Sequence, residues 1–257
     1  MPSSASNKRH FIIVGVLVVV TTIVMGVLLN TALPLPEAAS LQSGTVDTLF
    51  RVHMWLIAFL FSLVCVFMVY SFVVFRRGKR EDEGEHFEGN TALEILWTVV
   101  PLVLVVIFSF IGVRTLAEIT AAKPQELVVN VTAQQWSWMF AYPNGTTNAE
   151  LVVPVNQPLQ LEMASKDVIH DFWVKEWRMK QDIVPGLLTH IHYTPIATGE
   201  FTLACNQVCG LSHTNMYAKV RVVTQEEYTA WAQQQALAQG VELDAQAMKV
   251  DLQTASN

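Results

Sequence analysis

Charged side chains are scarce in this chain of 257 residues. They make up 15% of it, against about 25% in a typical soluble domain, while hydrophobic residues reach 52%. This balance excludes an ordinary soluble protein and indicates that part or all of the chain lies in a membrane. The formal net charge of −6 argues against nucleic acid as a partner and would suit a positively charged one.

Cysteine is also rare. The chain has three, too few for a disulfide framework, and it lacks the Cys-x-x-Cys-His motif of covalent haem attachment. Two of the three nevertheless lie four residues apart in CNQVCGLSHTNM (residues 205–216), with His213 and Met216 just beyond them. This concentration of sulfur and imidazole is the main chemical feature of the sequence.

Three uncharged apolar runs occupy residues 11–29, 54–75 and 95–113. Each is close to the ~20 residues that a helix needs to cross a bilayer. Basic residues precede the first run and fill the loop at 76–93, whereas residues 30–50 have none. We therefore expect that loop inside the cell and the chain after the third run outside it, in the periplasm or its equivalent. We favour a retained helix for the first run, with a secretory signal peptide as the alternative.

Beyond residue 126 the apolar pattern changes to a period of two. This alternation, with turn formers between the runs, predicts short strands and a Greek-key sandwich or barrel. Capping-box patterns predict a helix start at Thr91 and another at Thr224, the second helix ending near Gly240. The expected strands are residues 126–133, 136–142, 159–164, 187–196, 200–204 and 216–223.

The loop at 205–216 admits three interpretations. On the outer side of a membrane, a Cys205–Cys209 disulfide is the simplest. Two cysteines and two histidines would also suit tetrahedral zinc. Methionine, however, is a soft thioether ligand that favours copper, and two thiolates can bridge two copper ions with one histidine on each.

A metal site of this kind needs a second histidine from elsewhere in the chain. His190 and His192 lie two apart in an expected strand, so they share one face, which is typical of ordinary surface residues. His170 lies in a turn-rich stretch, 35 positions before Cys205.

At this point the sequence resembles a known family, the dinuclear copper (Cu-A) subunit of haem–copper oxidases, cytochrome c oxidase subunit II. Four blocks carry the resemblance, in the family's order: EGNTALEILWTVVPLV (88–103), QQWSWMFAYPNG (134–145), DVIH to QDIVPG (167–186) and GEFTLACNQVCGLSHTNMYAKV (199–220).

The resemblance implies a membrane-anchored chain. Its N-terminal transmembrane α-helices, a hairpin plus an extra N-terminal helix, would precede an all-β, cupredoxin-like Greek-key domain. We expect four parts: an N-terminal transmembrane segment or signal peptide with an external linker (1–50), the transmembrane hairpin (51–118), the periplasmic copper domain (119–225) and a C-terminal helix and tail (226–257).

The resemblance also implies a ligand set for the two copper ions. Cys205 and Cys209 would bridge the metals, His170 and His213 would each bind one, and Met216 and the backbone carbonyl of Gln207 would be weak ligands. The family usually has glutamate at position 207, where its carboxylate helps to bind magnesium. An amide there leaves magnesium binding open.

Three further residues match functional positions of the family. Trp136 would receive the electron from the donor, although Trp136 and Trp138 could instead share one face of a core strand. Asp167 would help to dock a lysine-ringed cytochrome, or is an ordinary solvated carboxylate. Glu94 would lie at the mouth of a proton-uptake channel, or only cap a helix.

The implied function is that of an oxidase subunit embedded in a bacterial inner membrane. It would take electrons from cytochrome c, a small copper protein or a quinol-oxidising complex, and pass them to haem in the catalytic subunit I. That subunit would reduce O2 to water and translocate protons. The alternatives are a related quinol oxidase subunit without copper and a membrane-anchored copper carrier.

Overall fold

The computed structural model describes residues 4–76 and 88–241. It divides into two compact units. The helical unit contains the residues up to Leu35 and Asp47–Gly112, and the β unit contains Pro36–Val46 and the chain from Val113 onward.

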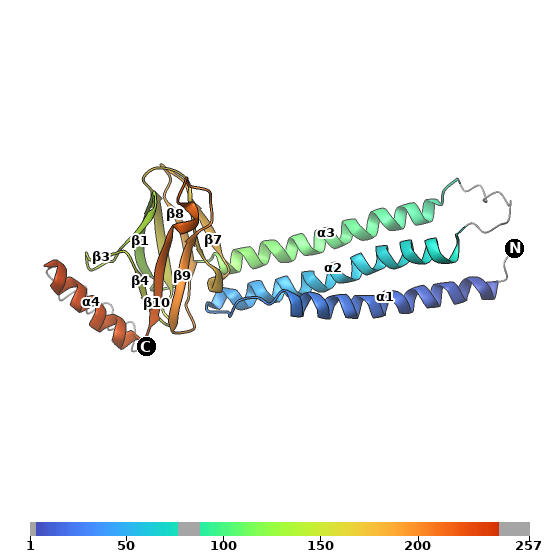
Figure 1. Ribbon diagram of the computed structural model, residues 1–257, viewed down its shortest axis with the longest axis horizontal. Coiled ribbons are helices and arrows are strands. Elements are labelled where there is room, and N and C mark those ends of the chain that lie inside the picture. Colours follow the sequence, from blue (N-terminus) through green and yellow to red (C-terminus); the bar gives the residue numbers. More distant parts are fainter. Residues whose placement is uncertain (1–3, 77–87, 242–257) are drawn as a thin grey trace. The chain divides into compact units, whose positions relative to one another are not determined.

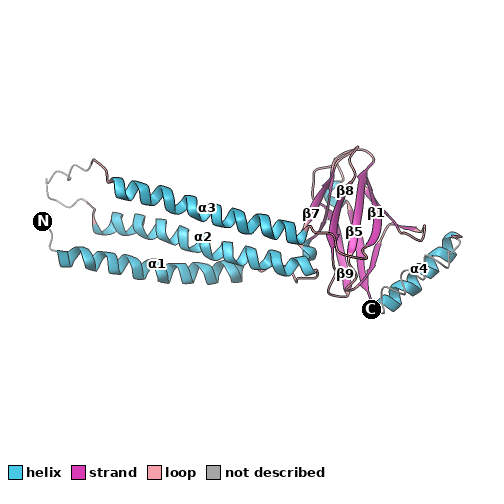
Figure 2. Ribbon diagram, turned by 180° about the vertical axis from the view of Figure 1, so that it is seen from behind, coloured by secondary structure: helices cyan, strands magenta, loops and turns pink. Residues whose placement is uncertain are grey.

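The helical unit is built from three long apolar helices, α1 (Ser4–Ala32), α2 (Leu41–Val74) and α3 (Thr91–Ile119). All three are long and apolar enough to cross a membrane, as the three apolar runs predict. They run side by side (Figures 1 and 2). The helices extend beyond the apolar runs at one or both ends because polar residues continue the same hydrogen-bonded turns.

Small and polar side chains fix the contacts between these helices. Gly26 of α1 leaves room for the indole of Trp55 on α2, since a Cβ at Gly26 would lie 2.1 Å from that ring. Nearer the start of α1, His10 Nδ1 lies 2.7 Å from the hydroxyl of Tyr70 on α2. His53 of α2 packs edge-on against Phe108 of α3.

The start of α3 differs from the prediction by one residue. Asn90, not Thr91, provides the side-chain cap: its Oδ1 accepts a hydrogen bond from the Leu93 backbone N–H at 3.2 Å. Asparagine is among the best N-cap residues, so the cap moves to the residue before the threonine. Glu94 lies in the first turn of the helix.

The β unit consists of two five-stranded sheets (Figure 2), in the orders β3-β2-β1-β5-β8 and β4-β10-β9-β6-β7. Two parallel pairs, β1 with β5 and β4 with β10, join strands that are distant in sequence. The two inner faces form one core, and β1 shows the alternating burial that this requires. The strands are β1 (Leu127–Gln134), β2 (Ser137–Ala141), β3 (Thr147–Asn148), β4 (Leu151–Pro154), β5 (Leu159–Ser165), β6 (His170–Val174), β7 (Lys180–Ile183), β8 (Thr189–Tyr193), β9 (Gly199–Cys205) and β10 (Tyr217–Val223).

This architecture confirms the predicted order of long apolar helices followed by an all-β domain. The six expected strands are present as β1, β2, β5, β8, β9 and β10. The sequence did not predict β4, because all four of its residues are buried and it shows no alternation. Nor did it predict β6, which begins with the buried polar residues His170 and Asp171.

Two further segments complete the β unit. Helix α4 (Gln225–Gln239) begins with the predicted Thr224–Glu227 capping box and ends at Gly240, in the left-handed conformation. The segment Pro36–Val46, expected to be part of an external linker, belongs to this unit: the Leu41 N–H donates to the carbonyl of Thr194 at 2.9 Å.

The core supports a prediction about stability. Leu161 is fully buried on β5, the strand that joins β1 to β8, so Leu161→Ala should lower the free energy of unfolding by about 2–5 kcal/mol. Lys219→Ala, which breaks only an exposed ion pair with Glu200, should cost less than about 1 kcal/mol. Thermal melting of the full chain in detergent, followed by tryptophan fluorescence, compares the two. Equal melting temperatures would contradict the proposed core.

Candidate metal centre

The centre of the site is a pair of thiols that are close but not bonded. The sulfur atoms of Cys205 and Cys209 lie 3.7 Å apart, whereas a disulfide bond is about 2.05 Å long. Both side chains are buried and both cysteines are free. The structure therefore contradicts the disulfide interpretation of this loop.

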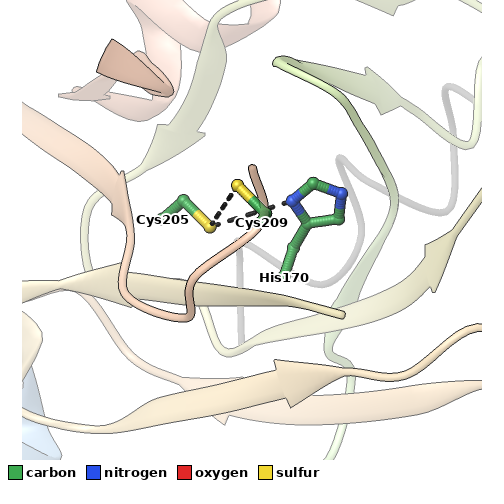
Figure 3. A group of neighbouring side chains, drawn as sticks. All are labelled: His170, Cys205 and Cys209. Carbon is green, nitrogen blue, oxygen red and sulfur yellow. Dashed lines mark hydrogen bonds between the residues drawn. The ribbon is translucent and has the colours of Figure 1, made fainter. Parts of the chain in front are cut away.

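His170 completes a cluster of three donors (Figure 3). It is the first residue of β6, is fully buried, and its Nδ1 lies 3.8 Å from the sulfur of Cys205. The ligand atoms of His170, Cys205 and Cys209 all lie within 4.8 Å of one another. Residues 35 positions apart meet because β6 pairs with β9, which ends at Cys205.

The second half of the site comes from the loop between β9 and β10. His213 Nδ1 and Met216 Sδ lie 3.5 Å and 3.8 Å from the sulfur of Cys209. The carbonyl oxygen of Gln207 lies 3.3 Å from the sulfur of Cys205. Each thiol thus has one imidazole and one weaker donor beside it, and all six expected ligands come together.

Backbone hydrogen bonds hold this loop closed at its base. The Cys205 N–H donates to the carbonyl of Met216 at 3.1 Å, and the Asn206 N–H donates to the carbonyl of Asp171 at 3.3 Å. A 3-10 turn at His213–Asn215 then directs His213 back toward the thiols. These backbone contacts hold the donors close together.

A side chain at Gly210 would strain this loop. The φ of Gly210 is +117°, a region that other residues rarely adopt. A Cβ there would also lie 2.8 Å from the amide nitrogen of Gln135 and 3.2 Å from the ring of Trp136. The glycine lets the β1–β2 turn pack directly on the ligand loop.

Trp136 lies in that turn and contacts the ligand loop. Its indole N–H donates to the carbonyl of Cys209 at 3.2 Å, and the Gln135 amide donates to the same oxygen at 2.8 Å. Trp136 is partly exposed, whereas Trp138 is buried with its ring edge-on to His170. The two tryptophans therefore do not share one face of a core strand.

Asp167 is built into the site through both of its oxygens. Oδ1 accepts a hydrogen bond from His170 Nε2 at 2.8 Å, and Oδ2 accepts one from the Gln135 backbone N–H at 2.7 Å. Desolvation raises the pKa of this carboxyl, but these hydrogen bonds outweigh it and lower the pKa to about 2. Because the carboxylate accepts the hydrogen bond from Nε2–H, the lone pair of Nδ1 faces the thiols.

Sequence reasoning missed two polar features near the site. Asp171, next to His170, is fully buried against Lys180 at 3.0 Å; burial and Asp182 raise its pKa to about 6 despite the lysine. Gln135, with its bond to Cys209, was also missed. Only its place beside Trp136 in the QQWSW run could have indicated its role.

The remaining candidates lie elsewhere. His192, expected at the surface, is buried, and its Nδ1 lies 2.9 Å from the carboxylate of Glu126, so that expectation was wrong. His190 is exposed, as expected. Glu94 belongs to the helical unit.

The donor set is suited to copper. Two thiols, two imidazoles, a thioether and a carbonyl exceed the four ligands of structural zinc, and the thioether is a soft donor. Both thiols are buried among apolar side chains, which suits a site closed to solvent.

Comparison with known proteins identifies the family. A model described as cytochrome c oxidase subunit II, periplasmic domain, matches residues 145–223, and one described as its transmembrane domain matches residues 28–115. The chain belongs to the cytochrome c oxidase subunit II family. It is therefore a subunit of a haem–copper oxidase, and a membrane protein with a periplasmic domain.

Relatives in this family cover most of the chain. Cytochrome c oxidase subunit 2 of Synechocystis is 30% identical over 86% of this chain and 80% of its own length. Subunit 2 of Thermostichus vulcanus is 30% identical over 78% of each chain. The alternative subunit 2 of Bradyrhizobium diazoefficiens is 30% identical over 75% of this chain and 80% of its own. In this family, the His170, Cys205 and Cys209 cluster indicates copper binding.

The role of Asp167 can be tested by metal affinity. Asp167→Asn removes the charged acceptor of the His170 ring, so copper affinity should fall by about 10- to 100-fold. Competition with a chelator, on the detergent-solubilised full chain, measures this. Glu200→Gln removes an exposed carboxylate on β9 and should leave the affinity unchanged. Equal affinities for the two variants would refute the positioning role.

Proposed function

We propose that this subunit carries a dinuclear Cu-A centre in a bacterial inner membrane and receives single electrons from a periplasmic donor. Cytochrome c, a small copper protein or a quinol-oxidising complex could serve as that donor. The electron then passes to haem in the catalytic subunit I, where O2 is reduced to water and protons are translocated.

One observation carries the proposal: the six donors divide into two sets around a pair of thiols. Cys205 has His170 and the Gln207 carbonyl beside it, and Cys209 has His213 and Met216. A single ion would not need two imidazoles on different thiols and two weak donors as well. Two ions bridged by both sulfurs would use every donor.

The protein contributes rigidity to this centre. When bound, the copper pair would accept and release one electron at a time with its charge spread over both metals. The strands β6 and β9 hold His170 and Cys205, and the closed loop holds the other donors, so little rearrangement accompanies a change of charge. A low cost of rearrangement suits electron transfer rather than bond-making chemistry.

Trp136 is the residue that we assign to electron uptake. Its ring is partly exposed and its N–H reaches the carbonyl of Cys209, so a single side chain joins the surface to a ligand. Asp167 remains a predicted docking residue, although its two oxygens are engaged within the protein.

Two proposals concern other parts of the chain. Glu94, in the first turn of α3, would supply a carboxylate at the mouth of a proton-uptake channel. Magnesium binding beside Gln207 would depend on an amide oxygen in place of the family's carboxylate, which is a weaker ligand.

Two alternative functions for this fold are those of a quinol oxidase subunit without copper and of a copper carrier. The complete donor set speaks against the first, because loss of copper would leave no reason to keep two buried, unbonded thiols. The contact between Trp136 and the ligand loop speaks against the second, since a carrier needs no path to the surface.

Removal of one bridging thiol tests the centre. Cys209→Ser should lower the copper bound by this subunit below two ions per copy, and turnover of the purified oxidase with the donor should be lost. The matched control is Cys65→Ser, which changes a cysteine of α2 and should affect neither quantity. Unchanged copper content and turnover in Cys209→Ser would refute its assignment as a ligand.

Removal of the exposed indole tests electron uptake. Trp136→Ala should slow electron transfer from the donor by about tenfold or more, because a central aromatic contact and a short tunnelling step are both lost. The copper absorption should persist. Stopped-flow mixing with reduced donor measures the rate, and Met139→Ala, an exposed change on β2, is the control. Unchanged kinetics in Trp136→Ala would place electron uptake elsewhere.

A further inference from the structure

Three loops meet on the outside of the proposed copper site. They are the β1–β2 turn with Trp136, the β5–β6 loop with Asp167, and the ligand loop with Gly210. The Gln135 N–H donates to Asp167, the Gln135 amide donates to the Cys209 carbonyl, and Gly210 packs against the Trp136 ring. The three loops therefore contact one another over the centre.

These loops expose several apolar side chains. They include Leu211, which is 98% exposed, and the partly exposed Trp136, Val168 and Ile169. We call these four residues the loop patch. Such exposed apolar groups beside a functional group are typical of an interaction site rather than of an ordinary surface.

The three loops also carry few charges. Residues 134–137, 165–170 and 205–216 contain only two charged side chains, Lys166 and Asp167. They cancel formally, and both oxygens of Asp167 are engaged by His170 and the backbone of Gln135. The acidic surplus of the whole chain, −6, is thus not concentrated where the electron would be received.

Resting on the function proposed above, we infer that the loop patch docks a soluble one-electron donor protein whose redox centre is ringed by uncharged, apolar side chains. Opposite charge steers a lysine-ringed cytochrome to an acidic surface, but this surface offers no unengaged acid in its three loops. Burial of Leu211 and Trp136 would drive the association instead. One electron leaves the donor's metal and enters the copper pair, and no atom is transferred.

Binding and electron transfer can test this with two probes and the assembled oxidase. The first probe is a small blue-copper protein with an apolar, uncharged ring around its exposed copper ligand; the second is a lysine-ringed cytochrome c. The first should bind in its metal-free form and, when reduced, should transfer electrons. Its affinity and rate should change less than about twofold between about 10 mM and about 200 mM salt.

Variants of Leu211 provide the residue-level test. Leu211→Ser should weaken binding of the metal-free blue-copper probe by about five- to tenfold, and Leu211→Asp should weaken it further. Leu237→Ser removes an equally apolar side chain, 78% exposed on α4, and should have no effect.

The contrary results are distinct. Tighter binding of the cytochrome with a steep loss of affinity in salt, or equal binding by all Leu211 variants, would overturn the docking inference. The inference would also be overturned if the Leu211 variants changed the assembly of the oxidase but not the binding of the donor, because another subunit would then cover the patch. Absence of copper from the wild-type oxidase would instead refute the proposed function, and binding of the metal-free probe reports on the patch independently of it.

Discussion

The site depends on one constraint: two buried sulfur atoms are kept 3.7 Å apart without a bond between them. That separation is too long for a disulfide and short enough for both sulfurs to bind the same pair of metal ions. It is maintained because Cys205 ends β9, where its N–H is bonded to Met216 across the base of the loop. Gly210 then lets the chain turn under Trp136 before His213 returns to the thiols.

The β1–β2 turn, the β5–β6 loop and the ligand loop have one function on their inner side and another on their outer side. On their inner side, His170 and the ligand loop provide the donors of the metal site, and Asp167 orients the ring of His170. On their outer side they expose apolar side chains, Leu211 most of all. Trp136 belongs to both sides, because its ring is partly exposed while its N–H bonds to the carbonyl of Cys209.

Local pattern was enough to predict the parts of the fold that follow a single period. The three apolar runs gave the membrane helices, and the Thr224 capping box gave the start of α4. Local pattern did not predict β4, whose burial has no period. Nor did it predict β6, which begins with the buried polar residues His170 and Asp171. The Asn90 cap was missed because two adjacent residues can both cap a helix.

The candidate site, too, could be predicted from the sequence only in part. The spacing of Cys205, Cys209, His213 and Met216 lies within one loop and is visible in the sequence, whereas the choice of His170 over His192 needed a family resemblance. The structure supplies the physical reason, since β6 pairs with β9 while His192 is engaged by Glu126. Contacts between distant loops, such as Asp167 with Gln135, leave no pattern in the sequence.

The most direct test of the account is electron paramagnetic resonance of the oxidised complex, combined with copper analysis. The account predicts two coppers for each copy of this subunit and a hyperfine pattern in which one unpaired electron is shared by both nuclei. A single copper with its electron confined to one nucleus, or no copper at all, would contradict it.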